Sequence, residues 1–128
     1  MTSQSRSAIQ NSHTNQRDLM WSRSEKAIAR KAFHAALKRE LHEVIQEAKQ
    51  MAGQIQRPSD LWDLEHYLTE RRKEIDRKYD YRYSQLTLVF GKLLRESRLG
   101  EEELRGLQED KLESIRSYAR FLAKIVAA

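Results

Sequence analysis

The sequence of 128 residues contains no cysteine, a single proline and only four glycines. Without cysteine the chain forms neither a disulfide nor a thiolate metal site, which fits a reducing compartment. No apolar run approaches the roughly 18 residues that a membrane-spanning helix needs. The N-terminus also lacks the apolar segment of a secretory signal peptide. We therefore expect a cytoplasmic protein that does not cross a membrane.

Motifs that carry enzyme chemistry are missing as well. The sequence has no glycine-rich phosphate loop, no nucleophile elbow and no HExxH zinc motif. Asp63, His66 and Glu70 share one helix face and resemble half of a di-iron site, but the second half of that pattern is absent. A surface histidine with carboxylate neighbours explains these residues better. We predict no catalytic activity, no metal and no cofactor.

The residues that are abundant favour helix: Leu, Ala, Glu, Lys, Arg and Gln. Residues 1–21 are instead rich in Ser, Gln and Asn, and we expect them to form a disordered arm. Residues 22–128 are predicted to form a single helical domain. Within it, 22–98 form a long-helix stem and the start of a head, and 99–128 form the rest of this C-terminal head.

Helix boundaries follow from local signals. The first helix should begin after Ser22 or Ser24, either of which can cap it, and its apolar residues recur at helical spacing as far as Ile55. The loop GQIQRPSD follows, in which Pro58 suits the first position of a second helix. From 58 to about 98 only Gly91 interrupts the helix formers, so one helix of about 60 Å is predicted. Leu99-Gly100 ends it, and a short helix and a last helix over 109–126 complete the chain.

Two helices of this length overhang any core that one chain of this size can form, since such a globule is only about 30–35 Å across. A second copy is the simplest cover for the remaining apolar stripe. We therefore predict an all-α homodimer with a long antiparallel helical hairpin stem and a small C-terminal helical head. The predicted dimer interface consists of Leu41, Ile45, Leu61, Leu64, Leu68, Arg72, Ile75 and Tyr79.

One residue of that interface is charged. Arg72 lies four residues after Leu68 and three before Ile75, which places it in the apolar seam and Arg71 to its side. A charged residue in a seam fixes the pairing of helices or binds a partner. In an antiparallel dimer we expect a carboxylate of the other chain, Glu65 first and Asp76 second, to meet Arg72.

Trp62 lies on the same helix, and Trp, Tyr and Arg dominate interface hot spots. Its side chain either packs against the first helix or is presented to a partner protein. The sequence leaves both readings open.

The net charge of +5 permits nucleic-acid binding, but acidic and basic residues interleave as on solvated helix faces. The best candidate for DNA contact is the last predicted helix, where Arg116, Arg120 and Lys124 recur every four residues. Residues 100–128 nevertheless carry five basic and six acidic residues. A DNA-binding regulator is the alternative function from a different class, and we do not expect nucleic acid as the partner.

The central part of the sequence resembles the cyanobacterial fluorescence recovery protein family. The resemblance rests on DLW-x-L, R-x-EID-x-KYD-x-R and VF-x-x-LL, which are here Asp60, Leu61, Trp62, Leu64, Arg72, Glu74, Ile75, Asp76, Lys78, Tyr79, Asp80, Arg82, Val89, Phe90, Leu93 and Leu94. The resemblance implies an all-helical, dimeric protein without catalytic activity. It implies a partner, the photoactivated orange carotenoid protein (through its C-terminal domain) or a related protein. Binding speeds return to the resting orange form and so ends quenching of the phycobilisome.

The resemblance also implies which residues contact the partner: Trp62, Glu65, His66, Arg72, Leu88 and Phe90. The sequence departs from the family pattern at some of these positions. Glu65-His66 stands where the pattern has histidine then aspartate, Leu88 replaces an aromatic residue, and Ser114 replaces a lysine. A relative with another protein partner, in a bacterium without phycobilisomes, is therefore a second alternative.

Overall fold

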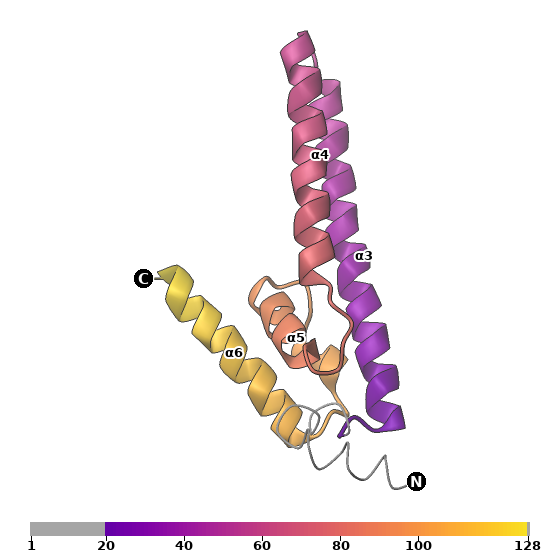
Figure 1. Ribbon diagram of the computed structural model, residues 1–128, viewed down its shortest axis with the longest axis vertical. Coiled ribbons are helices and arrows are strands. Elements are labelled where there is room, and N and C mark those ends of the chain that lie inside the picture. The colour runs from indigo at the N-terminus through magenta and orange to yellow at the C-terminus, as the bar shows by residue number, and fades with distance from the viewer. Residues whose placement is uncertain (1–19, 128) are drawn as a thin grey trace, which may run out of the picture.

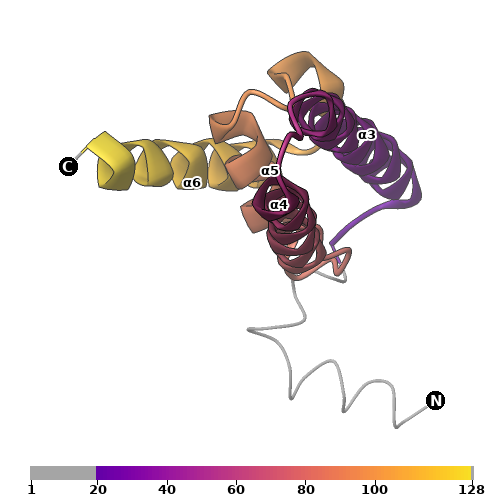
Figure 2. The same ribbon diagram turned by 90° about the horizontal axis from the view of Figure 1, so that it is seen from above.

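The computed structural model describes residues 20–127 and confirms the predicted all-α architecture. Its helices are α3 (Arg23–Gly53), α4 (Pro58–Lys78), α5 (Leu86–Arg95), the 3-10 helix η1 (Glu101–Leu104) and α6 (Glu109–Ala127). Helices α3 and α4 lie side by side as an antiparallel hairpin, and α5, η1 and α6 form a head at its base (Figures 1 and 2). Most of the arm predicted for residues 1–21 lies outside the described residues. No helix of the described part has the length and apolarity needed to cross a membrane.

Helix α3 starts where the sequence predicts. The Ser22 hydroxyl accepts a hydrogen bond from the backbone N–H of Glu25, and the Glu25 carboxylate accepts one from the N–H of Ser22, so a capping box closes the helix. The same carboxylate is buried and accepts from the backbone of Gln108 and from Lys111, at 3.1 Å. The start of α3 is thereby bound to the start of α6.

The prediction of one continuous helix over 58–98 is wrong, because α4 ends at Lys78 and α5 begins only at Leu86. Between them Tyr79 and Tyr81 place their rings 5.4 and 4.9 Å from the Phe33 ring of α3, and Tyr83 lies 5.6 Å from Trp21. In a helix, alternate residues point about 200° apart, so these three rings could not all reach α3. A non-helical segment lets all three tyrosine rings make these contacts, and their packing outweighs the local helix propensity.

The core of the head forms where α5 crosses α6. Leu86, Val89, Phe90 and Leu93 of α5 are buried there, with Ile115 of α6. The two helices approach so closely at Gly91 that a Cβ on this residue would lie 2.9 Å from Cδ2 of Tyr118 and 3.0 Å from the carbonyl oxygen of Ile115. Gly91 is thus required by the α5–α6 contact.

Replacing Gly91 by alanine should therefore destabilise the protein by about 1–3 kcal/mol, because the backbone oxygen of Ile115 cannot yield as a flexible side chain would. Urea unfolding measures this loss. Gly53→Ala is the matched control, since no atom lies within 4 Å of its Cβ position, and it should gain up to about 1 kcal/mol from helix propensity. Equal stability of the Gly91→Ala variant and the unmodified protein would contradict the close approach.

Candidate functional site

Large apolar side chains are exposed along the stem. Leu41 and Ile45 of α3 are 43% and 50% exposed, and Leu61, Trp62 and Leu68 of α4 are 47%, 63% and 41% exposed. A hollow of about 590 Å³ beside Leu41 and Ile45 is also lined by Leu37 and His42. Exposed apolar surface of this kind is typical of protein–protein interfaces.

Helix α4 carries two apolar stripes, and only one of them faces α3. The inward stripe is partly or fully buried at Leu64, Tyr67, Arg71, Ile75 and Lys78. The outward stripe, spaced by four, three and four residues, consists of Leu61, Glu65, Leu68 and Arg72, all exposed. The side chain of Trp62 lies next to this outward stripe and is the most exposed of the stem's large apolar residues.

Of the two neighbouring arginines, Arg71 is enclosed by its own chain, and the place of Arg72 in the dimer interface stays a prediction. Arg71 lies on the inward stripe and binds the buried Glu40 of α3 at 2.9 Å, whereas Arg72 faces outward. Arg72 makes no ion pair within residues 20–127. Since 71 and 72 differ by about 100° around the helix, only one of the two can face α3.

Two residues of the predicted dimer interface belong to the chain's own packing instead. Ile75 is only 9% exposed. The Tyr79 hydroxyl donates a hydrogen bond to Glu40 at 2.9 Å, and its ring packs on Phe33. Ile75 within α4 and Tyr79 just after it are therefore covered largely by their own chain, and their place in a dimer interface stays a prediction. Leu64 is half-buried against α3, and Leu41, Ile45, Leu61 and Leu68 are left as the exposed candidates.

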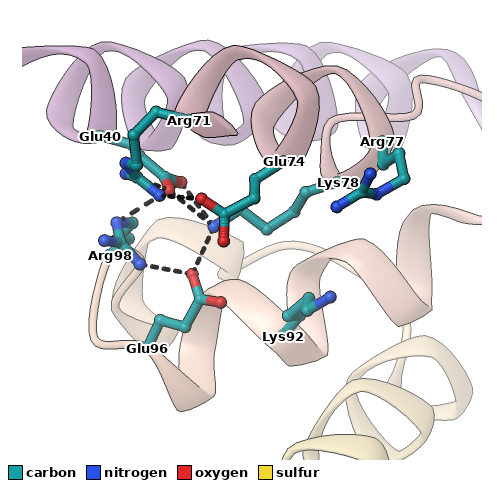
Figure 3. A pocket seen from close by; sticks show the side chains of 8 residues that line it. All are labelled: Glu40, Arg71, Glu74, Arg77, Lys78, Lys92, Glu96 and Arg98. Carbon is teal, nitrogen blue, oxygen red and sulfur yellow. Dashed lines mark hydrogen bonds and ion pairs between the residues drawn. The ribbon is translucent and has the colours of Figure 1, made fainter. Parts of the chain in front are cut away.

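Glu40 is the centre of the junction between stem and head (Figure 3). Its carboxylate is completely buried and binds Lys78 at 2.6 Å, Arg71 and Tyr79 at 2.9 Å each, and Arg98 at 3.5 Å. These partners come from α4, from the chain just after it, and from the turn after α5. One carboxylate of α3 therefore joins three segments of the chain.

The electrostatics of the junction follow from burial and hydrogen bonding together. Burial by itself would raise the pKa of Glu40, but hydrogen bonds from Lys78, Tyr79 and Arg71 outweigh it and hold the pKa below its usual value. Burial and the Glu40 carboxylate both raise the pKa of Tyr79, so the phenol keeps the proton that it donates. Glu40 is thus stabilised as a carboxylate.

Arg98 reaches this junction through a turn in the left-handed region of backbone space. Ser97 has φ 63°, and the N–H groups of Ser97 and Arg98 donate to the carbonyls of Leu94 and Leu93. This is the Schellman arrangement, which usually has glycine at the position of Ser97. The turn directs Arg98 back to the stem, where its guanidinium also binds Glu43 at 2.9 Å.

The head has a groove of its own between α5 and α6. It has a volume of about 660 Å³, and its lining includes Leu88, Ser114, Tyr118 and Phe121. Leu88 is 38% exposed and accessible to a partner, but Phe90 is fully buried in the head core. The prediction of Phe90 as a partner contact is therefore wrong in this conformation, because helix periodicity turns Leu88 and Phe90 to different sides of α5.

The remaining predicted residues lie on the surface of the stem. Trp62, Glu65 and His66 are exposed, so Trp62 does not pack against α3. Glu65 accepts a hydrogen bond from the Thr69 hydroxyl at 2.9 Å. Within residues 20–127 no group of three or more His, Cys, Asp or Glu side chains is arranged to hold a metal ion.

The basic face of α6 is largely neutralised by the chain's own carboxylates. Arg116 pairs with Glu101 at 2.9 Å and with Glu109 at 3.2 Å, and Arg120 pairs with Glu113 at 3.2 Å. Phosphate groups would have to compete with these carboxylates, which weakens the case for DNA contact through α6.

Comparison with known proteins agrees with the fold just described. The sequence profile of a family described as "Photoprotection regulator fluorescence recovery protein" matches residues 21–119. The chain belongs to this family.

Relatives within the fluorescence recovery protein family match over most of their length. The fluorescence recovery protein of Synechocystis sp. (strain ATCC 27184 / PCC 6803 / Kazusa) is 40% identical over 100 residues, which are 78% of this chain and 92% of the relative. The solved structure of the Fremyella diplosiphon protein has a TM-score of 0.75 and 43% identity, covering 78% of this chain and 98% of its own. That of the Synechocystis sp. PCC 6803 protein has the same TM-score and coverage with 40% identity.

Sequence reasoning missed the junction that holds the fluorescence recovery protein fold together here. Lys78 belongs to the quoted family pattern, but nothing in the sequence pointed to its pairing with Glu40 or to Arg98, although one signal was present. The buried stripe of α3 runs Ala29, Ala32, Phe33, Ala36 and Glu40. A glutamate that continues a stripe of small apolar residues has to be either exposed or paired, and here it is paired.

Glu40→Gln should lower the free energy of unfolding by about 1.5–3 kcal/mol at neutral pH, because a neutral amide replaces the buried carboxylate that accepts from Lys78, Tyr79 and Arg71. The three cations keep their other carboxylates, Glu74, Glu96 and Glu43. The folded-state pKa of Glu40 is lowered from 4.5, so its contribution is complete above that pH and is lost as the pH falls through the folded-state pKa. Urea unfolding across this range should show a weaker acid dependence in the variant than in the unmodified protein.

Glu74→Gln is the matched control. Glu74 also binds Arg71, at 3.1 Å, but its side chain is 52% exposed. An exposed pair of this kind contributes less than about 1 kcal/mol. Equal losses in the Glu40 and Glu74 variants would contradict the central place of Glu40.

Proposed function

We propose that this protein is a homodimeric, non-enzymatic regulator that binds the photoactivated orange carotenoid protein and speeds its return to the resting form. The observation that carries the proposal is the exposed outward stripe of α4 with Trp62 beside it, on a chain of the fluorescence recovery protein family. The family description names a photoprotection regulator, which supports action by binding rather than by catalysis.

Dimerisation is supported by the apolar surface that a single chain leaves uncovered. Leu41, Ile45, Leu61 and Leu68 are each between 41% and 50% exposed. A two-fold interface uses the same patch on both copies, so the exposed stripe of one chain can be buried against the same stripe of the other chain. In such a pair the outward-facing Arg72 meets the other chain, and Glu65 of that chain is its proposed partner.

Regulation of a photoswitch requires unequal affinities. A protein that binds both states equally shifts no equilibrium, so this one binds the photoactivated state more tightly than the resting state. To accelerate the return it binds the conformation at the top of the barrier more tightly still. The rigid stem presents Trp62, His66 and the guanidinium of Arg72 for this purpose.

The dimer can be tested with Ile45→Glu and Leu68→Glu. Both side chains are about half exposed in the single chain, at 50% and 41%, so each variant should stay folded. In a dimer the new carboxylate would be desolvated without a partner, at a cost of several kcal/mol, and the dissociation constant should rise at least a hundredfold. Sedimentation equilibrium measures it. Gln46→Glu, an exposed neighbour with the same change of charge, is the control, and an unchanged dimer in both test variants would contradict the interface.

The activity can be tested by following recovery of the orange form in the dark after photoactivation, with and without this protein. The unmodified protein should shorten recovery, and the double variant Glu65→Leu with Arg72→Met should keep its helicity and dimer mass but lose acceleration. If the double variant is fully active, Arg72 has no role in binding. If it becomes monomeric, the arginine specifies pairing.

Recovery at the rate of buffer alone with the unmodified protein would reject the orange carotenoid protein as partner. A family relative with another protein partner would then take its place, with the dimer result unaffected.

A further inference from the structure

The junction between stem and head encloses a crevice that neither the dimer nor the outward stripe uses. It has a volume of about 450 Å³ and lies between the end of α4 and α5. We call it the junction crevice, and Figure 3 shows the eight residues that line it: Glu40, Arg71, Glu74, Arg77, Lys78, Lys92, Glu96 and Arg98. Five of these side chains are cationic and three are carboxylates.

All three carboxylates already have partners among these cations. Glu40 binds Arg71, Lys78 and Arg98. Glu96 binds Lys78 and Arg98, and Glu74 binds Arg71. The three carboxylates of the junction crevice are therefore all paired with Arg71, Lys78 or Arg98, which are three of its five cations.

Arg77 and Lys92 are left over. Both are exposed, and neither makes an ion pair within residues 20–127. Figure 3 shows Arg77 entering from the end of α4 and Lys92 from α5, toward the same space. The other three cations are paired with carboxylates, so Arg77 and Lys92 carry the positive charge of the crevice that has no partner within residues 20–127. A partly enclosed site concentrates their positive potential.

Helix dipoles offer a simpler reason for these cations, because Arg77 and Lys92 lie in the last turns of α4 and α5. The same turns, however, also contain Lys78 and Arg95, which supply the same complement to the dipoles. Arg95 is exposed and does not line the crevice. It therefore separates an effect of the helix end from an effect of the crevice.

We infer that the junction crevice binds a carboxylate side chain from an acidic segment of the partner protein, between Arg77 and Lys92. The inference rests on the proposed function for the existence of a protein partner. The guanidinium of Arg77 offers two parallel N–H donors to a carboxylate, and Lys92 adds a point charge from the facing helix. The bound carboxylate supplies the negative charge that the crevice lacks.

The first experiment uses the protein alone and a hexaglutamate peptide as the probe. In nitrogen-15 NMR at low salt the peptide should shift the backbone signals of Asp76 and Lys78, which flank Arg77, and of Gly91 and Leu93, which flank Lys92. These shifts should vanish in the double variant Arg77→Gln with Lys92→Gln. The control pair Arg95→Gln with Lys49→Gln removes two exposed cations outside the crevice and should leave the shifts intact. Equal loss in both pairs would overturn the site in favour of nonspecific attraction.

The second experiment asks whether Arg77 and Lys92 merely support the fold. Their double variant should have an unchanged or slightly higher melting temperature, because it removes repulsion and breaks no ion pair within residues 20–127. A lower melting temperature would overturn the inference by making the two residues structural.

The third experiment measures binding to the photoactivated orange carotenoid protein. Neutralising Arg77 and Lys92 should weaken binding roughly tenfold and reduce its salt dependence, while the Arg95 and Lys49 pair changes little. Equal affinity of the crevice variant and the unmodified protein would overturn the inference and leave the proposed function standing. No binding by the unmodified protein would reject the proposed partner, and the hexaglutamate result would then decide whether the crevice binds carboxylates.

Discussion

The burial of one carboxylate, that of Glu40, is the constraint on which the rest of the structure depends. A carboxylate without solvent costs several kcal/mol unless it is paired and hydrogen-bonded. Glu40 is 0% exposed and meets that condition only if Arg71, Lys78, Tyr79 and Arg98 all converge on it. This requirement fixes three places relative to α3: the end of α4, Tyr79 just after it, and the turn after α5. Misplacing any one of them would remove a hydrogen bond from a dry ion cluster.

Packing of aromatic rings reinforces the same arrangement from the other side. Phe33, about two turns before Glu40 on α3, contacts Tyr79 and Tyr81 with ring centroids 5.4 and 4.9 Å apart. The ionic and the aromatic contacts therefore act on the same short segment, residues 79–85, and keep it out of the helix. The head is held at a defined place against the stem because Tyr79 and Tyr81 of this segment are bound to α3.

The surfaces proposed for binding make few of the contacts that stabilise the fold. The inward stripe of α4 stabilises the hairpin, whereas the outward stripe with Leu61, Leu68 and Arg72 stays exposed among the residues that the structure describes, 20–127. The head groove beside Leu88 and the junction crevice beside Arg77 and Lys92 are likewise open. A rigid scaffold that exposes apolar and cationic groups suits a protein that acts by binding, since little entropy is lost when those groups meet a partner.

The sequence by itself determined the features that depend on neighbours within a turn or two. The cap at Ser22, the start at Pro58, the last helix and the all-α class were predicted correctly, because capping and helix propensity are local. The family was also recognisable from a gapless run of side chains in α4 and α5. Only the tertiary structure decided that the helix breaks at Tyr79, that Arg71 rather than Arg72 is enclosed, and that Phe90 is buried. Each of these depends on contacts between distant segments, such as the hydrogen bond that joins Tyr79 to Glu40 across 39 residues. Helical spacing alone allows two stripes on α4, each a mixture of apolar and charged side chains, and does not indicate which one α3 covers.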